Sequence, residues 1–463
     1  PPIDTDVGQI KGLQLQQMMI NDIALGFIKE NGFEKDAGYV VMPDPRCPYN
    51  RVPMVCDDGS GEKKLVDIPM LVSLLENEDP RVGKLCKAAP TFRASTVKYL
   101  SGELKSFPSV CRSKLIYGYE DGFLEIGEYL PEDDEFMQTG QQKARPLLRF
   151  TPYDDVTDDH PLAKTVVRVF INTPFNRDWL TMTETELLER HCGVLKSVLD
   201  PSFHPEKPGM TEMWEINGKC EEWYIRDIIV ALLGRLLYKL NLCDSWRVML
   251  WLWGESSCGK TTLIELPLKS LFPKDTTGVI MDNFESVFGL GNLFHLQAVS
   301  FPDIKPGCPL KEATFQVMVE GGQTSVAIKN GIAKMPQWDK PMIAGSQHPP
   351  TPDIWPDPKQ AVTKRCFCAH FDTIPETTND RLQAEMCAAA HLGPTLVLLT
   401  RQYCRLKQFV GNRGFTEWAK TLHYVREQHE TQQLSNNHLL RFLVQTKGDN
   451  SSKEKIWWCE YAE

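Results

Sequence analysis

The segment Gly254-Glu255-Ser256-Ser257-Cys258-Gly259-Lys260-Thr261 fits the pattern G-x-x-x-x-G-K-[ST]. It follows a continuous apolar run at 248–253, which predicts a buried strand, and precedes 262–266, which can begin a helix. In a strand–loop–helix unit of this kind, successive backbone N–H groups and the start of the helix face an anion. The segment therefore predicts a loop that cradles the phosphates of a nucleotide.

Two side chains of this loop have distinct expected roles. Lys260 is expected to reach the β- and γ-phosphates, and the hydroxyl of Thr261 is expected to bind Mg²⁺. A chance match to the pattern is the alternative, and the apolar run directly before the loop argues against it. The predicted nucleotide-binding residues are Gly254, Glu255, Ser256, Ser257, Cys258, Gly259, Lys260, Thr261 and Thr262.

The whole chain has the composition of a globular protein. It contains 463 residues, of which 42% are hydrophobic and 24% are charged. This length predicts about two to four domains. No apolar run approaches the roughly 20 residues that cross a bilayer, so we expect no membrane partner. The chain begins with Pro1-Pro2 and lacks a signal-peptide pattern, which is typical of a fragment of an intracellular protein.

Cysteine spacing and net charge narrow the function classes. The 14 cysteines include no C-x-x-C pair, which favours reduced thiols over a disulfide framework. Cys47, Cys56, Cys86 and Cys111 do not have the spacing of a zinc site. The net charge of −10 argues against a protein that coats duplex DNA, but it allows a small positive internal channel.

Residues 1–174 predict an α+β region in which we identify no catalytic site. The stretch 115–129 predicts a strand–turn–strand unit with Asp121-Gly122 as its turn. Acidic groups at 132–135 and 154–159 resemble the carboxylate pairs that bind metal in nucleotidyl transferases. No strand bounded by glycines would hold these carboxylates in a fixed position. We therefore prefer to interpret them as charged residues of solvent-exposed loops.

Residues 175–245 predict a helical section. Thr183 and Glu186 have the spacing of a capping box at a helix start. Apolar residues then recur at helical spacing from Trp223 to Leu240, which predicts a helix of about five turns. This stripe packs in the core or against another subunit, and Asn241 is a plausible terminator.

Residues 246–375 carry the chemistry. Pro267 falls inside the helix expected after the loop and is expected to kink or end it. The run 298–303 predicts a short strand that ends in Asp303. A carboxylate at a strand tip beside a phosphate loop binds Mg²⁺ through water or orients the attacking water, whereas the alternative is an ordinary strand end. Pro302 stands where many such enzymes have a second acid.

The segment 324–334 predicts a β-hairpin. Two alternating stretches flank Asn330-Gly331, the dipeptide that favours a type I′ turn. Lys329 precedes the turn and Lys334 follows it. The segment is either an exposed hairpin with solubilising lysines or a pore hairpin in which Lys329, Asn330 and Lys334 meet the phosphate backbone of DNA.

Two further strands complete the series. The run 341–347 ends in polar groups, and the amide of Gln347 could sense a γ-phosphate or hold the attacking water. Arg365 introduces the predicted strand 366–371. A lone arginine before a strand is usually a surface residue, and its place in this ordered series is what singles it out. The sequence of residues 376–463 predicts helices. These helices could form either a lid or a winged-helix unit that binds DNA.

The series of phosphate loop, strand-end carboxylate, lysine hairpin, polar strand end and arginine resembles the viral superfamily 3 helicases. The likeness spans about 175–445 and is strongest to the helicase or primase-helicase proteins of large DNA viruses of the pox- and phycodnavirus kind. It implies an α/β fold: a P-loop AAA+ domain at 246–375 with a helical collar at 175–245 and a helical C-terminal region at 376–463. The α+β region 1–174 precedes these parts.

The resemblance also implies roles for single residues. The motif residues Gly254, Gly259, Lys260 and Thr261 would hold ATP and Mg²⁺, and Asp303 would bind the metal and orient water. Gln347 would stand where the family usually has Asn. Arg365 would match the arginine finger, which acts on the nucleotide of a neighbouring subunit. Lys329 and Lys334 would match the pore hairpin.

The implied activity is ATP-dependent unwinding of DNA by a ring of six copies. The ring would travel on single-stranded or forked DNA, usually 3′ to 5′, with a primase and other replication proteins as partners. Its expected location is the host cytoplasm or nucleus at sites of viral replication. The alternatives are an AAA+ packaging or remodelling ATPase acting on duplex DNA or protein, a small-molecule kinase, and a module that binds ATP without hydrolysing it.

Overall fold

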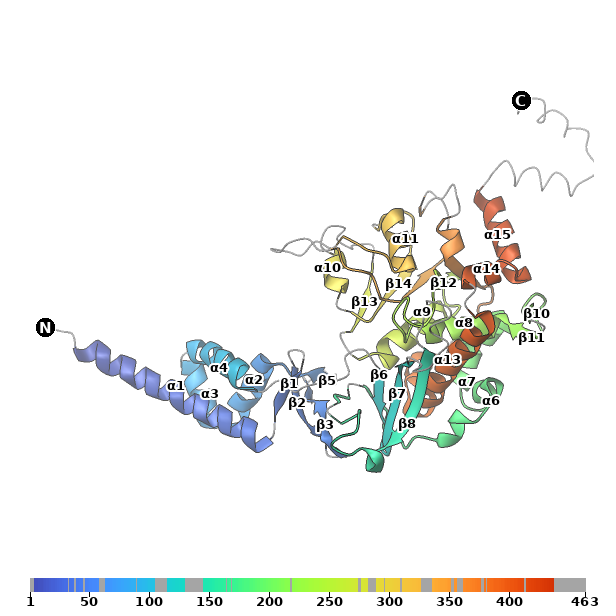
Figure 1. Cartoon of the computed structure of the whole chain (residues 1–463). Coiled ribbons are helices and arrows are strands. Elements are labelled where there is room, and N and C mark those ends of the chain that lie inside the picture. The colour runs from blue at the N-terminus through green and yellow to red at the C-terminus, as the bar shows by residue number, and fades with distance from the viewer. Residues whose placement is uncertain are drawn as a thin grey trace, which may run out of the picture. The chain divides into compact units, whose positions relative to one another are not determined.

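The computed structural model divides into two compact units. The N-terminal unit comprises Pro1–Glu125 and Arg149–Phe175, and the C-terminal unit comprises Ile126–Leu148 and Asn176–Glu463. The structure describes residues 4–436 except 32, 37–38, 45, 58–62, 89, 105–114, 130–144, 164, 168, 217–218, 274–275, 282–288, 295, 309, 326–334, 351–353, 356–360, 376–378, 380 and 412–413. Figure 1 labels many of the helices and strands of both units.

The first half of the N-terminal unit is a helical cluster with small antiparallel sheets. Its elements are α1 (Asp4–Asn31), β1 (Glu34–Asp36), β2 (Tyr39–Asp44), β3 (Cys47–Pro53), β4 (Val55–Asp57), β5 (Lys63–Leu65), α2 (Ile68–Glu78), α3 (Pro80–Ala88) and α4 (Pro90–Glu103). The side chain of Asp67 caps α2 by accepting a hydrogen bond from the Met70 N–H. Helix α1 packs on α4, and buried apolar residues of α1, α2 and α4 share one core.

A four-stranded sheet follows, in the order β8-β7-β6-β9. Its strands are β6 (Leu115–Gly118), β7 (Gly122–Tyr129), β8 (Arg145–Pro152) and β9 (Val169–Phe170), with the 3-10 turn η1 (Tyr153–Asp155) after β8. The predicted turn at Asp121-Gly122 is confirmed, since the Tyr119 N–H donates to the Gly122 carbonyl at 2.8 Å. The carboxylates of Asp154, Asp155, Asp158 and Asp159 are exposed, as expected of solvated loop charge, whereas 132–135 lie outside the described residues.

The second segment of the C-terminal unit, from Asn176 onward, begins with helices and a hairpin. They are η2 (Arg177–Leu180), α6 (Glu184–Arg190), α7 (Gly193–Phe203), β10 (Thr211–Ile216), β11 (Lys219–Tyr224) and α8 (Ile225–Arg235). The predicted capping box is confirmed. The Glu186 N–H donates to the Thr183 hydroxyl at 3.2 Å, and the Thr183 N–H donates to the Glu186 carboxylate at 3.0 Å.

The hairpin β10–β11 corrects one sequence-based expectation. The helix expected to start at Trp223 starts instead at Ile225, because Trp223 belongs to β11. Ile216 pairs with Lys219, so the connection has two residues, and Asn217-Gly218 is the dipeptide that favours such a connection. Trp223 is nonetheless fully buried. The apolar stripe therefore predicted burial correctly but misplaced both ends of the helix, which stops at Arg235 instead of reaching Leu240.

A five-stranded parallel sheet forms the centre of the C-terminal unit, which is thus a mixed α/β fold. Its strands are β12 (Met249–Gly254), β13 (Thr277–Val279), β14 (Ala298–Ile304), β15 (Met342–Ser346) and β16 (Cys366–Phe371), in the order β13-β14-β15-β12-β16. The strands expected at 248–253, 298–303, 341–347 and 366–371 are confirmed. The carboxyl ends of these parallel strands lie at one edge of the sheet, where ligand sites usually form.

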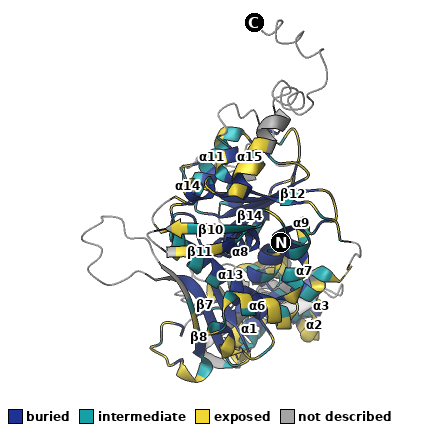
Figure 2. Ribbon diagram, turned by 90° about the vertical axis from the view of Figure 1, so that its right-hand side faces the viewer, coloured by how far each residue is buried: buried dark blue, intermediate teal, exposed yellow. Residues whose placement is uncertain are grey.

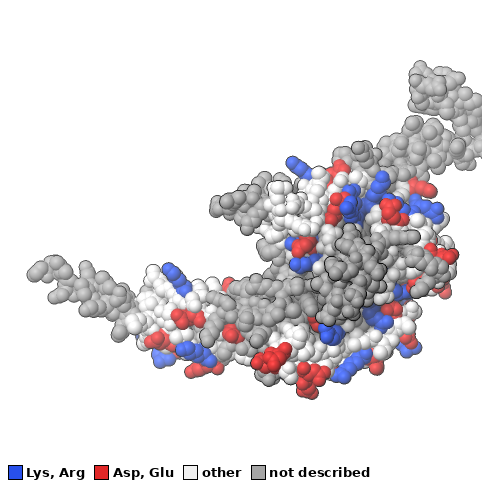
Figure 3. All heavy atoms as spheres, in the orientation of Figure 1, with Lys and Arg blue, Asp and Glu red and all other residues white. Residues whose placement is uncertain are grey.

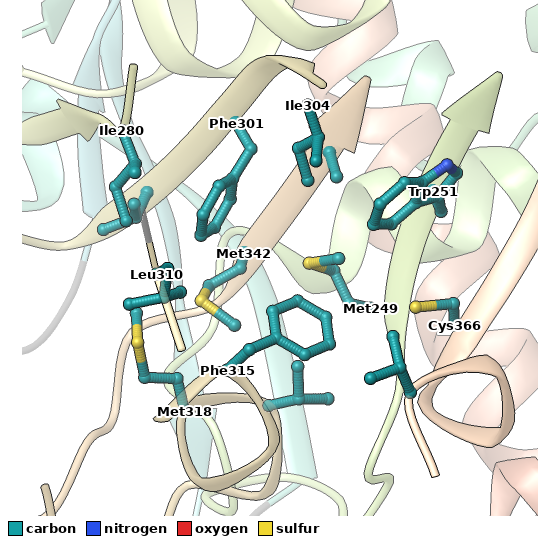
Figure 4. Close-up of a cluster of buried hydrophobic side chains, with 14 of the residues drawn as sticks. Met249, Trp251, Ile280, Phe301, Ile304, Leu310, Phe315, Met318, Met342 and Cys366 are labelled. Carbon is teal, nitrogen blue, oxygen red and sulfur yellow. The ribbon is translucent and has the colours of Figure 1, made fainter. Parts of the chain in front are cut away.

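Helices cover both faces of this sheet, and β12, β15 and β16 are almost wholly buried (Figure 2). On one face, Met249, Trp251 and Phe301 pack with Phe315 and Met318 of α11 (Glu312–Glu320), as Figure 4 shows. Helix α9 (Lys260–Glu265) packs on β12, β14 and β15. The alternation of large apolar residues along β12 therefore serves two cores.

Helix α9 is short, as Pro267 predicted. It ends at Glu265 and passes into the wider π-type turn η3 (Leu266–Leu271). The remaining elements are α10 (Gly289–Leu293), η4 (Thr363–Arg365), α12 (Leu382–Met386), α13 (Ala389–Val410), α14 (Phe415–Ala419) and α15 (His423–Asn436). Among the helices in the described part of the chain, none combines the length and apolar character that a membrane span requires.

Helix α13 supports the sheet through α8, and the two helices lie side by side (Figure 1). A Cβ atom on Gly234 would lie 1.9 Å from the Leu399 carbonyl oxygen, so only glycine permits this approach. The next residue is the buried Arg235, whose guanidinium pairs with Asp244 at 2.7 Å, and the Tyr403 hydroxyl donates to the same carboxylate at 2.6 Å. Burial favours a higher pKa for Asp244, but Arg235 and these hydrogen bonds hold that pKa below its usual value.

Candidate functional site

The loop between β12 and α9 has a backbone that only glycine accommodates at two positions. Gly254 and Gly259 have φ of 141° and 94°, and Ser257 is also left-handed at 66°. A Cβ on Gly254 would lie 2.2 Å from the Phe371 carbonyl oxygen, and one on Gly259 would lie 2.8 Å from Val198. Left-handed residues at a strand–helix junction form the concave nest of N–H groups that binds anions. The fixed glycines of the motif are thus required by the geometry.

Lys260 is the first residue of α9, and its side chain returns to the loop. Its ammonium donates to the Gly254 carbonyl at 2.8 Å and to the Glu255 carbonyl, and it lies 3.3 Å from the sulfur of Cys258. The Cys258 thiol is buried and donates to the Glu255 carbonyl at 2.9 Å. These contacts place the lysine charge at the centre of the loop.

A cavity of about 700 Å³ opens beside this loop. Its walls include the loop residues 256–262, Asp303 from β14 and Gln347 directly after β15. Ser197 and Val198 of α7 and Pro375, Asn379 and Leu382 of the C-terminal region also line it. The structure therefore brings together Lys260, Thr261, Thr262, Asp303 and Gln347, which the sequence pattern had singled out separately.

Asp303 reaches the cavity from an irregularity in β14. Phe301 pairs with Ala344 and Ile304 with Ser346, so β14 has one extra residue between these pairs. Pro302, which has no N–H to donate, lies in this bulge, and its carbonyl approaches Gly345 so closely that a Cβ there would lie 2.6 Å away. Bulges of this kind re-aim side chains beside functional sites. The carboxylate of Asp303 is 44% exposed and lies 2.9 Å from the Lys305 ammonium.

Gln347 is held by the residue before it. The buried Ser346 hydroxyl donates to the Ile304 carbonyl at 2.7 Å and accepts a hydrogen bond from the His348 N–H at 3.2 Å. These contacts join the ends of β14 and β15, which carry Asp303 and Gln347. Sequence reasoning noted polar groups at this strand end but did not identify Ser346 as the connecting residue.

Arg365 lies away from the cavity. It ends η4, immediately before β16, and the amino ends of parallel strands lie at the edge opposite the phosphate loop. Its Nε donates to Glu320 at 2.9 Å and its Nη1 to the Ala361 carbonyl at 2.6 Å. Arg365 is therefore not brought together with the other predicted site residues of the same chain.

The structure describes the two segments that flank the predicted hairpin turn, and they pair with each other. The Thr324 N–H donates to the Pro336 carbonyl at 3.0 Å, and the Trp338 N–H donates to the Gly322 carbonyl at 2.9 Å. Gln323 faces Gln337 in an antiparallel bridge. We call the two paired segments, 321–325 and 335–338, the hairpin base. Its predicted turn, with Lys329, Asn330 and Lys334, lies outside the described residues.

Metal ligands and surface charge complete the description. In the part of the chain that the structure describes, no three His, Cys, Asp or Glu side chains form a group that could hold a metal. Thr261 and Asp303 nevertheless offer oxygen atoms to one cavity, and Mg²⁺ is commonly held by one or two such groups together with substrate phosphates. On the face in Figure 3, the described acidic and basic side chains are intermixed.

Comparison with known proteins identifies no family. No protein-family model matches the chain, and no curated protein matches it. Among solved structures, the A-form apo structure of the NrS-1 C-terminal region has a TM-score of 0.32 and 10% identity over 63% of this chain and 69% of that one. An apo structure of NrS-1 residues 305–718 has a TM-score of 0.31 and 9% identity over the same shares. Likenesses of this size say nothing about activity.

Proposed function

We propose that this chain is an ATP-dependent DNA helicase with an AAA+ core of the viral superfamily 3 type. One observation carries the proposal. The phosphate loop, Asp303 and Gln347 line one cavity at the carboxyl ends of β12, β14 and β15. Pockets at this edge of an open parallel sheet are the usual ligand sites of α/β folds. A cavity of about 700 Å³ also has the size of a nucleotide site.

ATP occupies this cavity with its phosphates in the loop. The Lys260 ammonium exchanges its contacts with the Gly254 and Glu255 carbonyls for contacts with the β- and γ-phosphates. Thr261 and Asp303 would hold Mg²⁺, which when bound would neutralise charge on the phosphates. Asp303 and Gln347 orient the water that attacks the γ-phosphate, because both side chains reach the cavity from neighbouring strand ends.

A second copy of the chain completes the site. Arg365 lies at the sheet edge opposite its own phosphate loop, so it acts on ATP bound by a neighbour in a ring of six copies. An arginine supplied in this way stabilises the charge of the transferring phosphoryl group and is worth about 10³–10⁵ in rate. Subunit contacts therefore control hydrolysis.

Single-stranded DNA is the proposed substrate of the ring. Lys329, Asn330 and Lys334 would contact its phosphates in the central channel, and the antiparallel hairpin base supports this proposal. Confining positive charge to a channel is compatible with a net charge of −10. By the family likeness the ring travels 3′ to 5′ from forked DNA, beside a primase, at viral replication sites in the host cell.

ATPase assays with different nucleic acids test this function. We expect single-stranded DNA to stimulate hydrolysis by the full chain and forked DNA to be unwound. Stimulation by blunt duplex alone would indicate a packaging motor instead. Hydrolysis indifferent to every DNA would indicate a remodelling ATPase or a kinase.

A further inference from the structure

Two arginines share one carboxylate at the sheet edge opposite the phosphate loop. Arg365 Nε donates to Glu320 Oε1 at 2.9 Å, its Nη2 contacts the same oxygen, and Arg247 Nη1 lies 3.8 Å from that oxygen. Arg247 precedes β12 and Arg365 precedes β16, and the first residues of these adjacent strands, Met249 and Cys366, are paired. The arrangement therefore leaves one excess positive charge on this edge.

The contact between Glu320 and Arg365 is of a kind that another anion can replace. Nε and Nη2 of Arg365 both contact Oε1 of Glu320. The pair therefore lacks the two parallel hydrogen bonds, one to each carboxylate oxygen, of the strongest arginine–carboxylate geometry. The side chains of Arg365 and Glu320 are 22% and 27% exposed, and that of Arg247 is 67% exposed. A terminal phosphate offers three oxygens and more charge than a carboxylate, so it suits two guanidiniums better.

Glu320 also adjoins the hairpin base. It is the last residue of α11, and its carbonyl accepts a hydrogen bond from the Asn241 amide at 2.9 Å. Gly321 follows with a left-handed φ of 69°, and Gly322 and Gln323 then pair with the other strand of the base. Only two residues thus separate the arginine-bound carboxylate from the bridge between Gln323 and Gln337.

We propose that Glu320 is a latch that the terminal phosphate of a nucleotide bound by a second copy displaces from Arg365 and Arg247. Arg247 then becomes a second phosphate contact beside Arg365. The released end of α11 shifts the hairpin base, which couples nucleotide state to DNA. Glu320 acts through the arginines and is a positioning residue. This inference rests on the proposed function, because it requires ATP at the neighbour's phosphate loop.

Mixed complexes test the phosphate contact. We expect Arg247→Ala to lower DNA-stimulated ATPase by about tenfold. Arg247→Ala chains mixed with Lys260→Ala chains should recover activity, because each defect lies on a different copy. Arg190→Ala, at an arginine that is also 67% exposed, is the control and should match the unmodified chain. Full activity of Arg247→Ala, or no recovery in complexes shown to be mixed, would overturn the role of Arg247.

Glu320→Gln tests the latch with little change in size. Without the charge that retains the arginines, ATPase without DNA should rise toward the DNA-stimulated rate, and stimulation by DNA should shrink toward onefold. Unchanged stimulation would overturn the latch, as would a uniform loss of activity with normal thermal unfolding. Should the variant unfold, Arg247→Ala must by itself reduce the stimulation by DNA, or the latch is wrong.

These outcomes separate the inference from the proposed function. If Arg365→Ala chains recover with Lys260→Ala chains but Arg247→Ala chains keep full activity, the inference fails and the proposed function stands. If Lys260→Ala retains hydrolysis, the proposed function itself fails.

Discussion

The hydroxyl of Ser346 donates to the carbonyl of Ile304 at 2.7 Å and so joins the strand ends that carry Asp303 and Gln347. Ser346→Ala removes this buried hydrogen bond, which costs about 0.5–1.5 kcal/mol of stability. Because the cavity depends on the two strand ends staying in register, we expect kcat for ATP to fall by about tenfold. Steady-state ATPase assays measure the change in kcat, and urea unfolding measures the change in stability.

Ser300→Ala is the matched control for that change. Ser300 is equally buried on β14. Its hydroxyl lies 3.5 Å from the carbonyl of Gly278, which belongs to the neighbouring strand β13 and not to β15. Its loss should spare kcat. Equal kcat losses in both variants would contradict a special role for Ser346.

Gly259 is predicted to tolerate no side chain. Gly259→Ala places a methyl group 2.8 Å from Val198 at a φ of 94°, so the phosphate loop must shift. We expect the affinity for ATP to fall by more than about tenfold, measured by titration with a fluorescent ATP analogue. Gly307→Ala, at a φ of 82° in open space, isolates the backbone strain of about 1 kcal/mol and should bind ATP normally.

Asp227 predicts a pH dependence of stability. Burial raises its pKa to about 6, against the opposing charges of Arg226 and Arg405. A carboxyl whose folded pKa exceeds its unfolded value adds stability below the unfolded pKa, and that contribution is lost as pH rises through the folded pKa. Between about pH 4 and 6, the unmodified chain should therefore lose stability relative to Asp227→Asn. Urea unfolding of both chains across this range checks the sign, and a difference that does not vary with pH would refute it.

The lysines of the predicted hairpin should govern DNA binding. Replacing Lys329 and Lys334 together by Ala removes two phosphate contacts per copy, so the affinity for single-stranded DNA and the unwinding rate should both fall. The slope of log affinity against log salt should also become shallower. Fluorescence anisotropy in a salt series measures this slope. Lys420→Ala, at the residue directly after α14, is the control. An unchanged slope in the double variant would exclude the pore role.

Much of the central sheet could be predicted from sequence because its strands are short apolar runs bounded by polar ends. The phosphate loop, Asp303 and Gln347 could also be predicted from the sequence, because the ends of parallel strands meet at one edge of the sheet. The β10–β11 hairpin was missed because the apolar spacing through Trp223 outweighed the Asn217-Gly218 signal. Tertiary folding alone could reveal Ser197 and Asn379 in the cavity wall or Glu320 beside Arg365.

The central claim is that ATP is hydrolysed in the cavity beside Lys260. Its most direct test is the rate of phosphate release with single-stranded DNA for the unmodified chain, Lys260→Ala and the surface control Lys269→Ala, whose ammonium is 59% exposed and pairs with Glu265. We predict no hydrolysis above background for Lys260→Ala and a normal rate for Lys269→Ala. Full hydrolysis by a folded Lys260→Ala chain would contradict the account.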